Sequence, residues 1–164
     1  MDKIKINTGL DGFILVDSIS KIEDSTIQGT KDFTRAPACL GIESLAQLGA
    51  LHVRFITGFE RHAFLLKIIR CKILETGVLT GKYLLDGTLI NRSGLAFSYR
   101  LRAQKENEAQ IKGEFLYATV DYDNRFKKEK LKQHYQKVFS CLQSGSKTGC
   151  CPKSRRDCTE IRLK

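Results

Sequence analysis

The chain has 164 residues, which suits one domain with a hydrophobic core that needs no disulfides. No stretch reaches the eighteen apolar residues of a membrane span, and the start Met1-Asp-Lys-Ile-Lys lacks the apolar core of a signal peptide, so a cytoplasmic protein is expected. Its six cysteines fit that compartment as free thiols, and Cys150, Cys151 and Cys158 do not have zinc-site spacing, so no metal is predicted. Residues 125–164 hold twelve Lys and Arg against three Asp and Glu, a net of +9 that leaves +1 of the chain's +10 for residues 1–124.

Period-two patterns dominate on both sides of one long apolar run. They predict strands over residues 13–23, 25–34, 62–74, 81–91, 95–103 and 111–122. In the fifth of these, Leu95, Phe97, Tyr99 and Leu101 are expected on one face. Two strands, a long helix, four strands and a terminal helix predict an α+β fold in which one antiparallel sheet wraps a central helix.

The C-terminal segment divides into a basic helix and a tail. From Arg125 to Phe139, apolar side chains recur at helical spacing among lysines, so a basic helix that docks on the core is expected. Periodicity is lost from Ser144 onward, which predicts a domain over residues 1–143 and a flexible basic tail over residues 144–164. The charge is compatible with a nucleic-acid contact, but no nucleic-acid-binding motif or aromatic stacking platform accompanies it, so an acidic protein or an anionic cofactor is an equally natural partner and no nucleic-acid partner is predicted.

The apolar run over residues 36–58 contains a carboxylate, which needs a physical reason. Glu43 and Gln47 lie one helical turn apart, within a single stripe along the helix. The stripe comprises Cys39, Leu40, Glu43, Gln47, Ala50 and Arg54, whereas Leu45, Leu48 and His52 point the other way. One interpretation is that Glu43 sits at a subunit contact, paired with Arg54 or a neighbour's lysine. The other is a catalytic carboxylate in an apolar cleft, where burial favours proton transfer.

Three motifs in this order resemble the hot-dog fold, specifically the 3-hydroxyacyl-[acyl-carrier-protein] dehydratases of bacterial fatty-acid synthesis. Phe13-Ile-Leu-Val-Asp17 is similar to an early family strand, and Gly29-Thr-Lys-Asp-Phe-Thr34 resembles the strand that follows. Pro37 through Ile42-Glu43-Ser-Leu-Ala-Gln47 resembles the start of the family's helix. The resemblance covers roughly residues 10–123 and implies a hot-dog dimer with its site at the subunit interface.

The resemblance also implies roles for residues of the helix. Glu43 corresponds to the family's catalytic acidic residue, and Gln47 to the glutamine that lines the same site. Gly41 falls near the turn where a backbone N–H polarises the thioester carbonyl, as a helix N-terminus can do. Cys39, Leu40 and Ala50 are expected along the acyl tunnel. No cofactor is implied beyond the phosphopantetheine on which acyl carrier protein holds the substrate.

One family feature is missing. The dehydratases carry an H-F-P-G loop, with the histidine base, between the second strand and the helix, but here Thr34 runs almost directly into Arg35-Ala-Pro37. His52 is expected in the core or an interface, His134 in solvent, and His62 at the surface or nearer the site. The shortened pattern is similar to the dehydratase-like subfamily of aryl-polyene and related lipid biosynthesis clusters, whose members work beside a second hot-dog protein that keeps its histidine.

Three functions follow from these expectations. The first is a dehydratase-like subunit for 3-hydroxyacyl thioesters of acyl carrier protein, which would dock on the basic helix through Lys127, Lys128, Lys130 and Lys132. The second is a hot-dog acyl thioesterase, in which Glu43 activates water or attacks directly and Gln47 orients it. The third is a non-catalytic subunit that binds acyl carrier protein or completes a partner's fold.

Overall fold

The structure is a computed structural model that describes residues 14–74 and 77–145. Its elements follow the order expected from the sequence. They are β1 (Ser18–Ile22), β2 (Thr26–Ala36), α1 (Ala38–Ile56), β3 (His62–Ile73), β4 (Leu79–Ser93), β5 (Ala96–Lys105), β6 (Glu108–Val120) and α2 (Lys128–Ser144). Only Pro37 separates β2 from α1, so the direct passage from strand to helix is confirmed.

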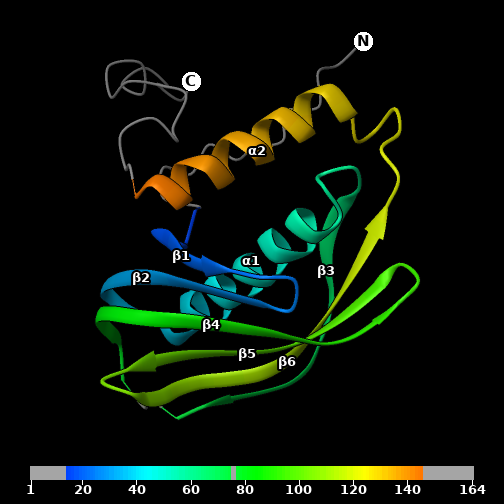
Figure 1. Cartoon of the computed structure of the whole chain (residues 1–164). Helices are drawn as coiled ribbons and strands as arrows, with labels where there is room; N and C mark the ends of the chain where they lie inside the picture. Colours follow the sequence, from blue (N-terminus) through cyan, green and yellow to red (C-terminus); the bar gives the residue numbers. More distant parts are fainter. Residues whose placement is uncertain (1–13, 75–76, 146–164) are drawn as a thin grey trace, which may run out of the picture.

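All six strands form one antiparallel sheet in the order β1-β2-β4-β5-β6-β3. β1 and β3 are therefore its edges, although β3 follows α1 directly in the chain. The sheet curves around α1, and α2 crosses the opposite side of that helix (Figure 1). This arrangement confirms the expected sheet wrapped around a central helix.

The buried side of the sheet meets α1 through tyrosines as well as aliphatic side chains. Tyr117 is fully buried, and its hydroxyl donates a hydrogen bond to the carbonyl oxygen of Ala46 at 2.9 Å. Its ring packs edge-on against Tyr99, with ring centroids 5.4 Å apart. A Cβ atom at Gly49 would come within 2.2 Å of the Tyr117 hydroxyl oxygen, so only glycine lets the helix lie this close.

His52 lies in this same contact and is fully buried. Its Nε2 is 2.7 Å from the carbonyl oxygen of Glu23, and its Nδ1 is 2.7 Å from the Tyr99 hydroxyl. A carbonyl only accepts, so Nε2 must donate, and Nδ1 of the neutral ring then accepts from Tyr99. Burial lowers the pKa of His52, which keeps the ring neutral. The prediction of a core histidine on the face opposite Glu43 is confirmed.

α2 docks on the core through its aromatic side, as the sequence indicates. Phe139 is buried and stacks on Phe55 of α1, with ring centroids 5.5 Å apart. The helix begins at Lys128, three residues after Arg125. The Asp123 carboxylate accepts hydrogen bonds from the backbone N–H groups of Arg125 and Phe126, which holds that stretch in a turn.

Leu95 departs from the sequence prediction. The alternating pattern extends to it, but its side chain is 55% exposed, whereas Phe97, Tyr99 and Leu101 are buried as expected. Leu95 follows Gly94, whose φ of 55° marks the left-handed turn between β4 and β5, and it precedes the first residue of β5. The turn interrupts the alternation before Leu95. In the part of the chain that the structure describes, no helix is long and apolar enough to cross a membrane.

Candidate active site

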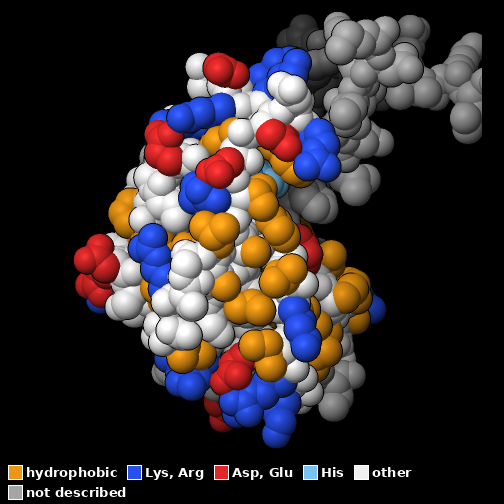
Figure 2. Space-filling view, turned by 90° about the vertical axis from the view of Figure 1, so that its right-hand side faces the viewer, with side chains coloured by type: hydrophobic (Ala, Val, Ile, Leu, Met, Phe, Trp, Pro, Cys, Tyr) orange, Lys and Arg blue, Asp and Glu red, His pale blue; other side chains and the backbone are white. Residues whose placement is uncertain are grey.

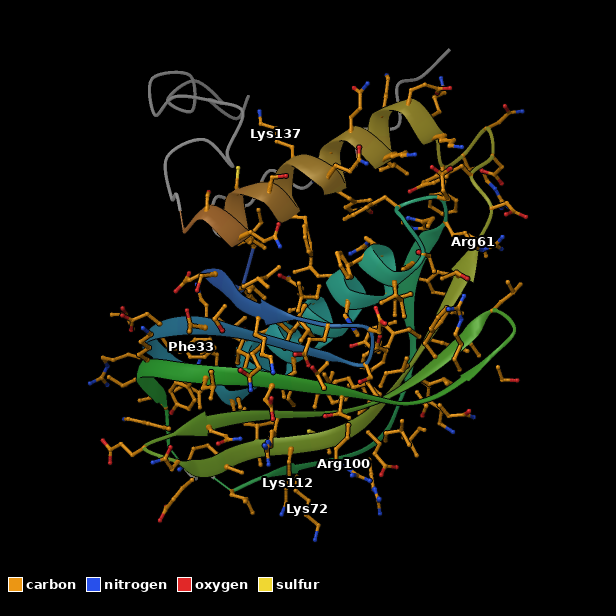
Figure 3. The ribbon with its side chains drawn as sticks, in the orientation of Figure 1. Phe33, Arg61, Lys72, Arg100, Lys112 and Lys137 are labelled. Atoms are coloured by element: carbon orange, nitrogen blue, oxygen red, sulfur yellow. The ribbon has the colours of Figure 1, made fainter. Side chains whose placement is uncertain are left out.

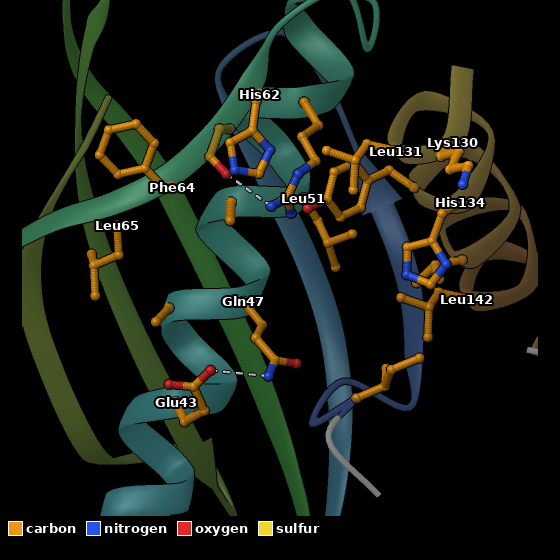
Figure 4. A pocket seen from close by; sticks show the side chains of 17 residues that line it. Glu43, Gln47, Leu51, His62, Phe64, Leu65, Lys130, Leu131, His134 and Leu142 are labelled. Carbon is orange, nitrogen blue, oxygen red and sulfur yellow. Dashed lines mark hydrogen bonds between the residues drawn. The ribbon is translucent and has the colours of Figure 1, made fainter. Parts of the chain in front are cut away.

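A cavity of about 530 Å³ lies between the exposed side of α1, the first residues of β3 and the inner side of α2 (Figure 4). Most of its wall is apolar. The apolar lining residues are Ile14, Ala46, Ala50, Leu51, Ala63, Phe64, Leu65, Leu131, Val138 and Leu142. Glu43, Gln47 and Arg54 line the cavity from α1. The polar side chains of the α1 stripe therefore border an apolar space that can hold an aliphatic chain.

Glu43 and Gln47 form a hydrogen-bonded pair that the backbone of Leu15 anchors. The backbone N–H of Leu15 donates to Gln47 Oε1 at 2.8 Å, which leaves Nε2 as the donor side of the amide. Gln47 Nε2 in turn donates to Glu43 Oε1 at 3.0 Å. The buried Leu15 segment therefore fixes Gln47, and Gln47 fixes the Glu43 carboxylate at the cavity wall. The pairing of Glu43 with Arg54 is not the one that forms here.

The first turn of α1 lies beside this pair. Pro37 occupies the N-cap position and offers no side-chain hydrogen bond to the first-turn amides, and that turn contains no acidic residue. Gly41 faces the sheet, because a Cβ atom there would come within 2.4 Å of Ile111 Cδ1. Ala50 lines the cavity, whereas Cys39 is exposed and Leu40 packs against the core.

A cationic cluster forms the other end of the cavity. The guanidinium carbon of Arg54 lies 3.9 Å from the centroid of the Tyr135 ring, and its Nη2 donates to the carbonyl oxygen of Ala63 at 2.9 Å. His62 stacks on Phe126 with ring centroids 4.5 Å apart. His62, His134 and Lys130 all line the cavity with Arg54. Burial, with the charge of Arg54, lowers the pKa of both histidines.

Sequence reasoning missed most of this cluster. His62 lies on the cavity wall and not at the surface, and His134 reaches the cavity although it remains exposed. Arg54 was recognisable from its place in the Glu43 stripe. Tyr135 and His62 come together with it only because α2 folds back over α1, which no local pattern indicates.

The histidines do not complete the Glu43 site within one chain. Arg54 lies eleven residues beyond Glu43 on α1, a rise of about 16 Å. His62 lies at the Arg54 end (Figure 4), and His52 is on the opposite face of the helix. All three histidines of the chain are thus accounted for, and none lies beside the Glu43 carboxylate.

The edge strand β3 continues from the cavity as an apolar surface. Five large side chains on and just after it are 37–56% exposed: Leu66, Ile68, Ile69, Ile73 and Leu74. Hydrophobic side chains gather on the face of the molecule that carries this strand (Figure 2). An edge with free backbone groups and an apolar surface is suited to pairing with another strand.

The four lysines proposed for docking have different surroundings. Lys128 and Lys132 both pair with Glu60, in the first case with Nζ 2.6 Å from Oε2. Lys127 is exposed, and Lys130 lines the cavity. No group of three or more potential metal ligands occurs within residues 14–74 and 77–145, and Cys150, Cys151 and Cys158 lie outside those residues, as does most of the proposed tail.

Comparison with solved structures finds the same fold in thioesterases and in a dehydratase heterocomplex. A thioesterase of Haemophilus influenzae has a TM-score of 0.56 and 15% identity, covering 63% of this chain and 77% of that one. A hypothetical thioesterase of Streptococcus pneumoniae, determined with coenzyme A, has a TM-score of 0.56 and 14% identity, covering 63% of this chain and 88% of that one. The dehydratase heterocomplex ApeI:P of Xenorhabdus doucetiae has a TM-score of 0.59 and 10% identity, covering 70% of this chain and 86% of that one.

No protein-family model matches the chain, and its sequence matches no curated protein. The structural likenesses, at 10–15% identity, establish the fold. The chain has the hot-dog fold expected from its motifs, while dimer formation stays a prediction.

Proposed function

We propose that this chain is a dehydratase-like subunit that acts on 3-hydroxyacyl thioesters of acyl carrier protein in fatty-acid or polyene lipid biosynthesis in the cytoplasm. The observation that carries the proposal is the Glu43 carboxylate, which Gln47 holds at the wall of an apolar cavity beside the start of α1. An acyl chain fits the apolar wall, and a thioester group fits the polar one.

The chemistry requires three groups. A base removes a proton from C2 of the thioester, an acid protonates the hydroxyl that leaves C3 as water, and hydrogen-bond donors stabilise the enolate-like oxygen while the C2–C3 double bond forms. Glu43 supplies the acid, and Gln47 orients it. The first-turn amides near Gly41, which no side chain caps, supply donors with the positive end of the helix dipole.

The base comes from a second hot-dog chain. No histidine of this chain lies beside Glu43, so elimination needs a group from outside it. The apolar free edge of β3 offers a surface on which such a chain can pair. The likeness to a dehydratase heterocomplex supports this arrangement. The acidic carrier protein then approaches the basic helix, where Lys127 and Lys130 are not engaged by Glu60.

The test is product formation from a 3-hydroxyacyl carrier protein, with this chain alone and with a histidine-bearing hot-dog partner. We expect little turnover alone and conversion to the enoyl thioester with the partner. Glu43→Gln should lower the rate of the pair by about 10² to 10⁴-fold, because a positioned acid-base group is lost. Glu108→Gln is the matched control, since that carboxylate is exposed and outside the cavity lining.

Full activity of this chain alone, or an unchanged rate with Glu43→Gln, would contradict the proposal. The second of these results would favour the non-catalytic binding subunit. Binding of the carrier protein gives a separate test of docking, in which Lys127→Glu and Lys130→Glu should weaken binding at low salt.

Thioester hydrolysis is the second candidate, and the solitary position of Glu43 favours it. A single carboxylate can activate water or attack the carbonyl carbon itself, with no second acid-base group. Two thioesterases among the structural likenesses support this alternative. The products separate the two reactions, because hydrolysis releases a free thiol that a disulfide reagent detects, whereas dehydration leaves the thioester intact and conjugated.

A further inference from the structure

Arg54 carries a positive charge that the described residues do not neutralise. None of the ion pairs within residues 14–74 and 77–145 includes Arg54. Its Nε is buried and has no hydrogen-bond partner, and the Nδ1 atom of neighbouring His62 is likewise buried without one. A buried guanidinium stays protonated and is unfavourable without a counter-charge, so this end of the cavity is incomplete.

The surroundings of Arg54 have the composition of an anion site. Tyr135 covers one face of the guanidinium, the bond from Nη2 to the Ala63 carbonyl fixes one end of it, and Arg54 lines the cavity. His62, His134 and Lys130 add donors from β3 and α2. The only carboxylate among the lining residues is Glu43, about 16 Å away along α1.

We propose that the Arg54 end of the cavity binds an oxyanion at the end of the ligand remote from the Glu43 site. The planar fork of arginine suits a carboxylate or a phosphate, with which it forms paired charge-assisted hydrogen bonds. The identity of the ligand rests on the proposed thioester function. Such a ligand offers two oxyanions: the phosphate of its pantetheine arm, or an acidic group at the far end of its acyl chain.

Binding of two matched pairs of probes to the full chain tests the proposal. The first pair is 4′-phosphopantetheine and pantetheine, and the second is pantetheine loaded with an eight-carbon acyl chain that either does or does not end in a carboxylate. In one of the two pairs, the anionic probe should bind at least about tenfold more tightly than its neutral counterpart. This factor corresponds to the free energy of one hydrogen bond to a charged group. The pair that discriminates identifies which end of the ligand Arg54 holds.

Arg54→Gln should remove that discrimination. Arg100→Gln is the matched control, because Arg100 is 65% exposed and lies on the outer face of the sheet with Lys72 and Lys112 (Figure 3). The exposed Lys130 allows a second variant that does not disturb the core, and Lys130→Gln should reduce discrimination by about threefold while Arg100→Gln leaves it unchanged.

Equal binding within both pairs by the wild-type chain would overturn the proposal without any variant. Discrimination that persists in Arg54→Gln would also overturn it, because the general basicity of the chain would then be the cause. Glu43→Gln separates this site from the proposed reaction. That variant should keep the discrimination, so loss of turnover with intact discrimination leaves the oxyanion site standing.

Discussion

The contact between Gly49 and Tyr117 gives a sharp test of how α1 is seated. In Gly49→Ala, the new Cβ atom would lie 2.2 Å from the Tyr117 hydroxyl oxygen, 2.5 Å from Cζ and 2.7 Å from Cε2. Tyr117 is fully buried and its ring is rigid, so the ring or the helix must move. Movement also breaks the hydroxyl's bond to the Ala46 carbonyl.

The expected loss of stability can be assembled from these contacts. Overpacking costs about 1–3 kcal/mol, and a buried hydroxyl left without its partner costs about 1–3 kcal/mol more. Alanine's helix propensity returns about 1 kcal/mol. The free energy of unfolding should fall by about 3 kcal/mol, which lowers the melting temperature by about 6–12 °C in a domain of this size.

Gly41→Ala is the matched control on the same helix. Its Cβ atom would meet only the terminal methyl groups of Ile111 and Leu79, at 2.4 and 2.7 Å, and such ends of flexible side chains can turn away. Thermal and urea unfolding should show a smaller loss than for Gly49→Ala. If both variants unfold alike, or if Gly49→Ala is as stable as the wild type, the close approach of Tyr117 is not what positions α1.

Three further predictions concern the core and α2. Burial lowers the pKa of His52 from 6.5, so on acidification the unfolded chain takes up the proton before the folded one does. The urea midpoint of unfolding should therefore fall as the pH decreases below about 6.5. Equal midpoints at pH 7.5 and about pH 5 would contradict this. Phe139→Ala should cost about 3 kcal/mol and speed hydrogen exchange in α2, while unchanged exchange would show that the Phe55 stack does not hold the helix. Lys128 and Lys132 hold the pKa of Glu60 at about 2, yet these groups are exposed, so Glu60→Gln should leave the melting temperature within about 1 °C by calorimetry.

The fold was predictable because its signals are local. The long apolar run ends at Gly58, whose φ of 62° is left-handed, and it predicted the central helix nearly to its ends at Ala38 and Ile56. Alternation predicted six strands with boundaries within three residues of those observed, except that β1 begins at Ser18, five residues after the predicted start. Leu95 was predicted on the buried face because the alternation of apolar residues in the sequence extends to it. In the structure Leu95 lies in the turn between β4 and β5, where the extended backbone is interrupted.

The cavity was predictable only from the side of α1. Helical geometry brought Glu43, Gln47, Ala50 and Arg54 together, and the structure places all four in the lining. Cys39, on the same stripe, is exposed, because helical angle does not tell where along a helix the walls of a cavity begin. Those walls come from β3 and α2, and α2 lies more than seventy residues further along the chain.

The polar contacts on the sheet side of α1 restrict the helix to one orientation about its own axis. An aliphatic helix on an aliphatic sheet can pack at several rotations about its own axis with similar energy, as loosely specified cores do. Three bonds are satisfied at a single rotation: from the Tyr99 hydroxyl to His52, from His52 to the Glu23 carbonyl, and from Tyr117 to the Ala46 carbonyl. Any other rotation would leave buried polar atoms without hydrogen-bond partners. The side chains of His52, Tyr99 and Tyr117 do not line the cavity, yet their bonds thereby determine that Glu43 faces it.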